Sequence, residues 1–163
     1  MRDPAFGETA MCRPLRAVLL ALAALSAALP TPAAEAPRYY RAPATAEADL
    51  PFSDAVRVGN LLFLSGQIGV LPGTLELARG GIAAESKQAM ENIRAVLAAN
   101  GASLDDVVKC TVFLADIRDW PAFNAVYRDF FRTHLPARSA LAASGLAMGA
   151  RVEVECVAAV GGR

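Results

Sequence analysis

The sequence predicts a single α+β domain in which two helices pack on one face of a mixed β-sheet. Two observations carry this prediction. Short runs of alternating or continuous apolar residues indicate strands, and two longer segments repeat their apolar residues with a helical period. Their order along the chain is strands, helix, strand, helix, strand, strand. At 163 residues the chain is long enough to bury a core of its own.

The N-terminal segment is predicted to lie outside this domain. After Arg13 and Arg16 comes an uncharged apolar run, Ala17 to Leu29. It is too short to span a bilayer comfortably and has the length of the apolar part of a signal peptide. Thr31-x-Ala33 is a suitable cleavage site. The alternative is a buried amphipathic or tail-anchoring helix.

We therefore interpret residues 1–36 as a leader and residues 37–163 as the exported domain. Residues 1–10 carry acids, whereas a start at Met11 would give the compact basic beginning that such leaders have. The expected location is periplasmic or secreted, with no stable membrane insertion once the leader is removed.

The exported domain is predicted to begin with strands. Arg38 to Asp49 is expected to form a short strand and then a loop, and Val56-Arg57-Val58 the next strand. Gly59-Asn60 is a hairpin-type turn signal. Leu61 to Ile68 is a nearly continuous apolar run, typical of a central strand. Gly66 interrupts its end, where a glycine often lets a ligand or another backbone come close.

Two helices follow, with a strand between them. From Ile82 to Asn100 the apolar residues form one helical stripe, and Asn100-Gly101 is a C-terminal signal. Val107 to Leu114 is rich in β-branched residues and predicts a strand. Asp119 is a suitable N-cap for the second helix, whose end we place at His134 and Pro136.

Two further strands carry the residues of chemical interest. In Leu135 to Ala143, alternation places Arg138, Ala140 and Ala142 on one face. A guanidinium among methyl-sized neighbours suits bidentate capture of a small carboxylate. In Arg151 to Val160, Glu153 and Glu155 share a face.

If these two strands pair, an arginine and a glutamate could converge on one ligand. The alternative is a cross-strand Arg–Glu pair on a solvated face, worth about 0.2–1 kcal/mol.

Several kinds of chemistry are absent from the sequence. His134 is the only histidine and there is no C-x-x-C or H-E-x-x-H motif, so a zinc site of the usual ligand type is not expected. Hydrolase, dinucleotide and P-loop motifs are missing. A Ser-His-Asp triad would have to use His134, which is more simply a residue at a helix C-terminus.

The zero formal net charge, with 16 basic and 16 acidic residues, does not predict a nucleic-acid partner. Cys110 and Cys156 lie on apolar strand faces, where free cysteine is usually a small buried hydrophobe. A disulfide between them would need neighbouring strands with Cβ atoms about 4 Å apart.

Five blocks in order and in register resemble the RidA (YjgF/L-PSP) family, and they cover the chain from about Phe52 to Ala159. They are V-G-N-L-L-F-L-S-G-Q-I, Q-A-M-E-N-I-R-A-V-L-A-A-N-G-A-S-L-D-D-V-V-K-C-T-V-F-L-A-D, F-N-A-V-Y-R-D-F-F, L-P-A-R-S and V-E-V-E-C-V-A. The resemblance implies a chorismate-mutase-like fold and a homotrimer whose sheets form an inner barrel, with clefts between subunits. It also implies a cofactor-independent, metal-free deaminase that hydrolyses reactive 2-imino or enamine acids to 2-keto acids and ammonia.

The resemblance also assigns site residues. Arg138 matches the arginine that holds the substrate carboxylate, and Glu153 matches the glutamate that activates water. Further matches line the pocket: Ser65 and Gly66 at the strand end, Asn124 in the second helix, and Ser139 beside the arginine.

Two positions depart from the family pattern. Where the family commonly has P-Y-S-Q, this chain has Pro51-Phe52-Ser53-Asp54, so the aromatic ring is kept without its hydroxyl. Ala140 replaces the cysteine usual two residues after the arginine. Both changes are expected to alter substrate choice and rate more than the carboxylate and water sites.

Two other function classes stay open. One is a non-catalytic trimer that binds small carboxylates or acts as a chaperone. The other is an endoribonuclease, against which the neutral charge and the predicted export both argue.

Overall fold

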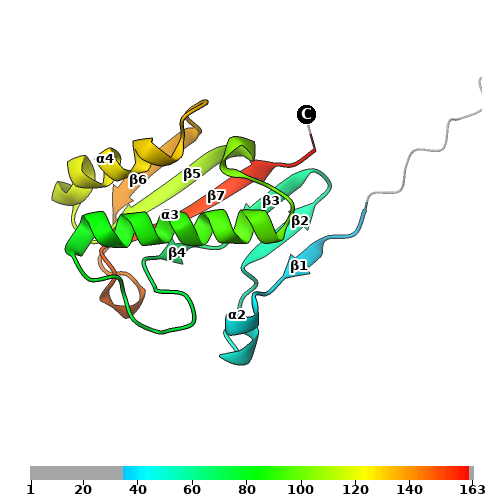
Figure 1. Ribbon diagram of the computed structural model, residues 1–163, viewed down its shortest axis with the longest axis horizontal. Coiled ribbons are helices and arrows are strands. Elements are labelled where there is room, and N and C mark those ends of the chain that lie inside the picture. The colour runs from blue at the N-terminus through cyan, green and yellow to red at the C-terminus, as the bar shows by residue number, and fades with distance from the viewer. Residues whose placement is uncertain (1–34, 162–163) are drawn as a thin grey trace, which may run out of the picture. The chain divides into compact units, whose positions relative to one another are not determined.

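The computed structural model describes residues 35–161, so the predicted leader's apolar run and its cleavage site at Ala33 lie outside the described residues. Seven strands form one sheet in this part of the chain (Figure 1). They are β1 (Arg38–Tyr40), β2 (Ala55–Val58), β3 (Leu61–Leu64), β4 (Gln67–Ile68), β5 (Val107–Leu114), β6 (Ala137–Ala142) and β7 (Val152–Ala159).

The sheet is mixed, as predicted. Its strand order is β1-β2-β3-β7-β5-β6, and β4 pairs with β7 beyond the end of β3. Strands β5 and β6 run parallel, and every other described pair is antiparallel. Because β5 lies between β6 and β7, the two strands that carry Arg138 and Glu153 are not neighbours.

Two helices cover one face of the sheet, which confirms the predicted α+β architecture. Helix α3 (Gly81–Ala99) packs on β7 and β4, and α4 (Trp120–Phe130) lies beside α3 (Figure 1). The strand residues beneath them alternate buried and open, as β7 shows. The largest fully buried side chains of this core are Phe123, Leu62, Met90, Ile93, Leu97, Leu114, Val107, Val112, Val152, Val154, Cys110 and Cys156.

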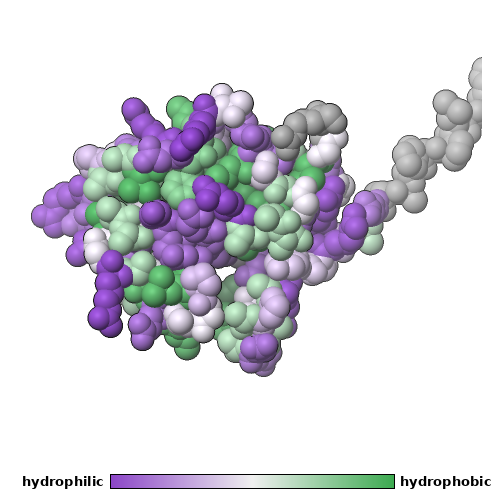
Figure 2. All heavy atoms as spheres, in the orientation of Figure 1, coloured by the Kyte–Doolittle hydropathy of each residue, from purple (hydrophilic) through white to green (hydrophobic). Residues whose placement is uncertain are grey.

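The other face of the sheet has no helix on it within residues 35–161. Buried Leu62 and Leu64 alternate along β3 with Leu61 and Phe63, which therefore point away from the helices. Phe63 is 43% exposed, and Leu141 of β6 is 46% exposed. The surface on the helix side, drawn in Figure 2, mixes polar and apolar residues. We call the helix-free side the open face.

Several predicted element boundaries are wrong. The long strand from Leu61 to Ile68 is divided into β3 and β4, because the chain turns at Ser65 and Gly66. The predicted loop before Asp49 contains a short helix, α2 (Pro43–Glu47), which begins with a proline in its first turn.

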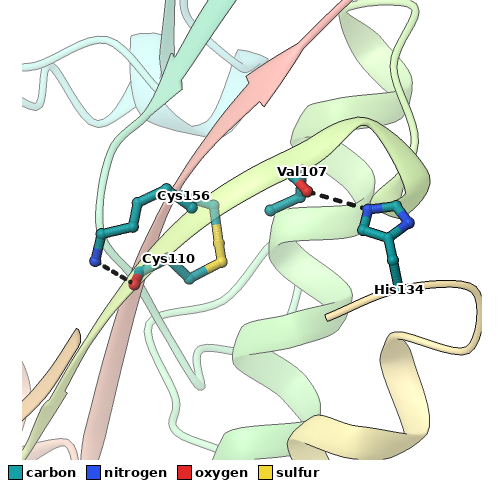
Figure 3. The surroundings of a disulfide bond; sticks show 5 residues. Val107, Cys110, His134 and Cys156 are labelled. Carbon is teal, nitrogen blue, oxygen red and sulfur yellow. Dashed lines mark hydrogen bonds between the residues drawn. A yellow bond between two sulfur atoms is a disulfide. The ribbon is translucent and has the colours of Figure 1, made fainter. Parts of the chain in front are cut away.

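Helix α4 ends at Phe130, before His134. His134 Nε2 instead lies 3.4 Å from the carbonyl oxygen of Val107 (Figure 3). Asp119 does occupy the N-cap position of α4, but its side chain pairs with Arg151 at 3.2 Å and does not cap the helix.

Cys110 and Cys156 form a disulfide between β5 and β7 (Figure 3). The two residues are directly opposite each other in the antiparallel ladder, with their Cα atoms 4.1 Å apart. Such close Cα atoms are typical of the pairs that exchange no backbone hydrogen bonds. Both residues are buried beneath the helices. Of the two alternatives left open by the sequence, the structure therefore has the bonded pair.

Candidate functional site

The side chain of Arg138 lies on the helix-covered face of the sheet. In the parallel ladder Arg138 is the partner of Cys110, and Cys110 is the partner of Cys156 in the next ladder. Residues paired across neighbouring strands share a face, and both cysteines are buried under the helices. The guanidinium therefore projects toward α4.

Aromatic rings of α4 surround this guanidinium. Its Cζ lies 4.8 Å from the ring centroid of Tyr127, 5.2 Å from that of Trp120 and 5.8 Å from that of Phe123. All three distances are within the range of cation–π attraction. Within residues 35–161, no carboxylate forms an ion pair with Arg138 and no acceptor takes a hydrogen bond from it.

A cavity of about 310 Å³ opens beside Arg138. The carboxamide oxygen of Asn124 and the hydroxyl of Tyr127 are buried without a hydrogen-bond partner in the described residues. Burial raises the pKa of Tyr127 to about 12, against the opposing charge of Arg138, so the phenol stays protonated at neutral pH and can donate. The cavity is lined by Trp120, Asn124, Tyr127, Arg128, Leu135, Pro136 and Arg138. Its cation and its unpaired donor suit a small carboxylate.

Glu153 lies on the open face. It is half-buried on β7, between buried Val152 and Val154 of the opposite face, and it is paired with Ile68 of β4. Burial raises the pKa of the Glu153 carboxyl above its usual range, and the charge of Glu155 raises it further. A carboxyl group whose pKa is moved toward neutrality is suited to general acid–base work.

The backbone at Gly66 lies directly against this carboxylate. A Cβ atom added at Gly66 would be 1.9 Å from Glu153 Oε1, so only glycine leaves room for the side chain as it is placed. The glycine in the apolar run predicted the close approach of a ligand or another backbone, whereas the structure places a side chain of β7 there.

The strand end before Gly66 also holds the segment that contains Phe52. The Ser65 hydroxyl donates to the carbonyl oxygen of Ser53 at 2.6 Å, and the Ser65 N–H donates to that of Asp54 at 3.0 Å. The buried Asp54 carboxylate accepts hydrogen bonds from the Ala42 N–H and the Thr45 hydroxyl. Phe52 itself is 45% exposed and lies near this strand end by chain connection.

The structure divides the predicted site residues into two groups. Asn124 lies with Arg138 at the cavity beside α4, whereas Ser65 and Gly66 lie with Glu153. Ser139 faces the open side, where its hydroxyl accepts a hydrogen bond from Lys109 at 2.8 Å. Ala140 packs against the core.

Arg138 and Glu153 were expected to converge on one ligand if their two strands paired. The strands do not pair, so this prediction is wrong for a single chain. The two side chains leave opposite faces of the sheet, and β5 separates their strands. For the same reason the alternative, a cross-strand Arg138–Glu153 ion pair, is also wrong. We call these two groups the arginine half and the glutamate half of the site.

Sequence reasoning missed Trp120 and Tyr127, which line the cavity beside Arg138. The available signal was spacing, because aromatic residues at 120, 123 and 127 fall on one face of a helix. Residues 35–161 contain no cluster of three or more His, Cys, Asp or Glu that could hold a metal ion. No helix in that range is long and apolar enough to cross a membrane.

Known proteins resemble this chain over most of the described domain. It is 48% identical over 108 residues to Protein HMF1 of Saccharomyces cerevisiae, covering 66% of this chain and 83% of the yeast protein. It is 43% identical over 111 residues to human 2-iminobutanoate/2-iminopropanoate deaminase, covering 68% of this chain and 81% of the human one.

A crystal structure of RidA from the Antarctic bacterium Psychrobacter superposes with a TM-score of 0.65 at 41% identity, covering 68% of this chain and 89% of that one. The family model described as Endoribonuclease L-PSP matches residues 42–160. The chain therefore belongs to the L-PSP family, which is also known as the RidA/YjgF family.

Proposed function

We propose that this protein hydrolyses 2-imino acids, and the enamine acids that tautomerise to them, to 2-keto acids and ammonia. The observation that carries the proposal is the guanidinium of Arg138, which faces a cavity of about 310 Å³ without a carboxylate partner in the described residues. Relatives named as 2-iminobutanoate/2-iminopropanoate deaminases support it.

The reaction requires little chemistry from the protein. The carbon of a protonated imine is already electrophilic, so attack by water forms a C–O bond, and a proton shift to nitrogen allows the C–N bond to break. The products are the 2-keto acid and ammonium, with no change in oxidation state. Arg138 holds the substrate carboxylate, and Glu153 takes the proton of the attacking water and returns it to the leaving nitrogen.

Each subunit supplies only half of such a site, and we propose that the protein is a homotrimer with its sites between subunits. Two observations support this. Arg138 and Glu153 leave opposite faces of one sheet, and the open face exposes large apolar side chains such as Phe63 and Leu141. In the trimer, the open faces form the inner barrel, and the Arg138 of one copy meets the Glu153 of the next.

The activity is tested by measuring ammonia and 2-oxobutanoate released from 2-iminobutanoate that is generated in the assay. We expect Arg138→Ala and Glu153→Gln each to reduce kcat/KM by about 100-fold or more. The matched controls are Arg94→Ala, which removes another half-exposed arginine, and Glu47→Gln, which changes an exposed carboxylate of α2. Wild-type rates in both test variants would refute the proposal.

The shared site is tested by mixing the two inactive variants. If random trimers form from Arg138→Ala and Glu153→Gln chains, about a quarter of the interfaces contain one intact arginine and one intact glutamate, so about a quarter of wild-type activity returns. A site within one chain would return none. Light scattering on the same sample measures the assembly mass directly.

We also propose that the domain is exported to the periplasm or secreted. The Cys110–Cys156 disulfide supports this, because disulfides persist mainly in oxidising compartments. N-terminal sequencing of the protein from fractionated cells tests it. An intact N-terminus in the cytoplasmic fraction would refute export.

A second candidate function is binding of small carboxylates without catalysis. Phe52 favours it, because this position lacks the hydroxyl that the family commonly places there. The two functions differ in what they require of Glu153. If the wild type binds a keto acid through Arg138 but hydrolyses imines no faster than Glu153→Gln does, the protein is a binding protein.

A further inference from the structure

Arg138 differs from the four described arginines that form ion pairs. Arg38, Arg94, Arg118 and Arg151 each form an ion pair with a carboxylate. Arg138 has none in the described residues and lies instead among aromatic rings. The sequence thus surrounds one half-buried cation with groups that attract its charge without occupying its N–H donors.

The difference has a direct consequence for recognition. A carboxylate partner binds the N–H edge of a guanidinium, which is the edge that a carboxylate ligand needs. An aromatic ring attracts the cation through the flat face of the guanidinium and leaves that edge available. Rings can therefore restrict the rotamers of Arg138 without competing with the ligand.

The rings come from one side of α4. Trp120 and Tyr127 are two turns apart on the helix, and Phe123 lies between them. Tyr127 is 3% exposed and is held by ring contacts with Phe123 and Phe131, at centroid distances of 5.5 Å and 4.7 Å. Because Tyr127 is fixed in the core, its ring is a rigid wall for the guanidinium. Tyr127 also lines the cavity, and its buried hydroxyl has no partner in the described residues.

We propose that Trp120 and Tyr127 are positioning residues, which hold the guanidinium of Arg138 by its faces and direct its N–H edge into the cavity. The inference rests on the proposed function, in which Arg138 binds the substrate carboxylate. The Tyr127 hydroxyl adds a donor to the same carboxylate. Substrate capture by this chain therefore depends on an aromatic–arginine unit built by α4 and β6.

The test measures binding of 2-oxobutanoate, the 2-keto acid product, by calorimetry on the full-length protein. Loss of one cation–π contact in Trp120→Leu is expected to weaken binding about 3- to 30-fold, and Trp120→Phe, which restores a ring, is expected to recover most of that loss. Tyr127→Phe keeps the ring and removes the hydroxyl, so it should weaken binding about 10-fold. In the deaminase assay, Trp120→Leu should raise KM with little change in kcat, because Glu153 lies in the other half.

The chain offers a matched control on the same helix. Arg94 Cζ lies 4.9 Å from the ring centroid of Phe130, and this pair borders a separate hollow between α3 and α4. Phe130→Leu therefore removes an aromatic ring beneath an arginine without touching the cavity of Arg138. It is expected to leave both 2-oxobutanoate binding and KM unchanged.

A spectroscopic readout separates positioning from general destabilisation. The side-chain Nε–H signal of Arg138, assigned by its loss in Arg138→Ala, should shift in Trp120→Leu and remain in place in Phe130→Leu. Melting temperatures of all variants are measured in parallel.

The outcomes distinguish this inference from the function beneath it. If Arg138→Ala binds 2-oxobutanoate as the wild type does, the proposed function fails and the inference fails with it. If Arg138→Ala loses binding while Trp120→Leu and Tyr127→Phe bind like Phe130→Leu, the inference alone is overturned. A loss in Trp120→Leu that Trp120→Phe does not recover also overturns it, because the ring face would then not be what matters.

Discussion

The two halves of the candidate site prepare a charged group in opposite ways. At the arginine half, aromatic rings stabilise the cation of Arg138 while its donors stay unpaired in the described residues. At the glutamate half, burial and the neighbouring charge of Glu155 disfavour the anion of Glu153. A group that binds an oppositely charged ligand is stabilised in its charged form. In a group that exchanges protons, the charged form is destabilised relative to the neutral one. This contrast fits the proposed roles of Arg138 in binding the substrate carboxylate and of Glu153 in proton transfer.

The largest effect is expected at the link between the halves. The Cys110–Cys156 disulfide joins β5 to β7. Strand β5 pairs with β6, which carries Arg138, and β7 carries Glu153. Replacing both cysteines by alanine should lower the free energy of unfolding in urea by about 2–5 kcal/mol, because the cross-link no longer restricts the unfolded chain. Neither half should lose its function selectively at temperatures where the protein stays folded.

Reduction of the wild-type protein provides the control, because it breaks the link and keeps both sulfur atoms in the core. A reduced protein with an unchanged unfolding midpoint would contradict the prediction, as would two alkylatable thiols in the purified denatured domain.

The next largest effect is expected from a substitution that alters the glutamate half alone. In Gly66→Ala the added methyl group takes the place of the Glu153 carboxylate, whose atoms belong to a flexible side chain and can move aside. We expect kcat to fall about 100-fold, the lower range of an acid–base contribution, with little change in melting temperature or in 2-oxobutanoate binding. Stopped assays and calorimetry on one preparation measure both quantities.

Gly145→Ala is the matched control, since no heavy atom lies within 4 Å of a Cβ added at Gly145. Equal kcat values for the two alanine variants would show that the contact between Gly66 and Glu153 has no part in turnover.

A smaller effect concerns pH. The pKa of Glu153 is raised first by burial and second by the charge of Glu155. As the proposed base that receives a proton from water, Glu153 must be ionised, so kcat/KM should rise as the pH rises through this pKa. Glu155→Gln removes the like charge, lowers the pKa of Glu153 and moves this acid limb to lower pH. Because Glu153 stays partly buried in this variant, the midpoint of the acid limb should remain above the pKa of an ordinary exposed glutamate.

The pH profile of kcat/KM in wild type and Glu155→Gln measures this shift. Glu47→Gln, a change at an exposed position of α2, is the control that should leave the profile in place. An acid limb that moves to higher pH in Glu155→Gln would contradict the assignment of Glu153 as the base.

Local features of the fold could be predicted from the sequence, and relations between distant strands could not. Strand β5 has the predicted bounds, and α3 differs from its prediction by one residue at each end, because their apolar periods are unambiguous. The alternation along β6 and β7 was also correct within each strand. Alternation leaves undetermined which face of one strand continues the face of another, since that depends on register and strand order.

The failed pairing of β6 with β7 illustrates this limit. Consecutive strands usually lie side by side, but here β5 separates them, and nothing in either strand reveals the insertion. Gly66 was more informative, because a glycine in an apolar run has few explanations, and its close neighbour proved to be Glu153. The aromatic residues of α4 were hidden by the ordinary expectation that such a stripe is only core.

The parallel pairing of β5 with β6 has a consequence for the order of folding. Strands β2 and β3 are joined by a two-residue turn and can pair within microseconds. Strand β6 reaches β5 only after the chain has crossed through α4, so its pairing must wait for a longer loop to close. We expect Arg138 to enter its aromatic surroundings late, when α4 docks. The formation of the arginine half would then report the final step of folding, which fluorescence of the single tryptophan, Trp120, can follow in real time.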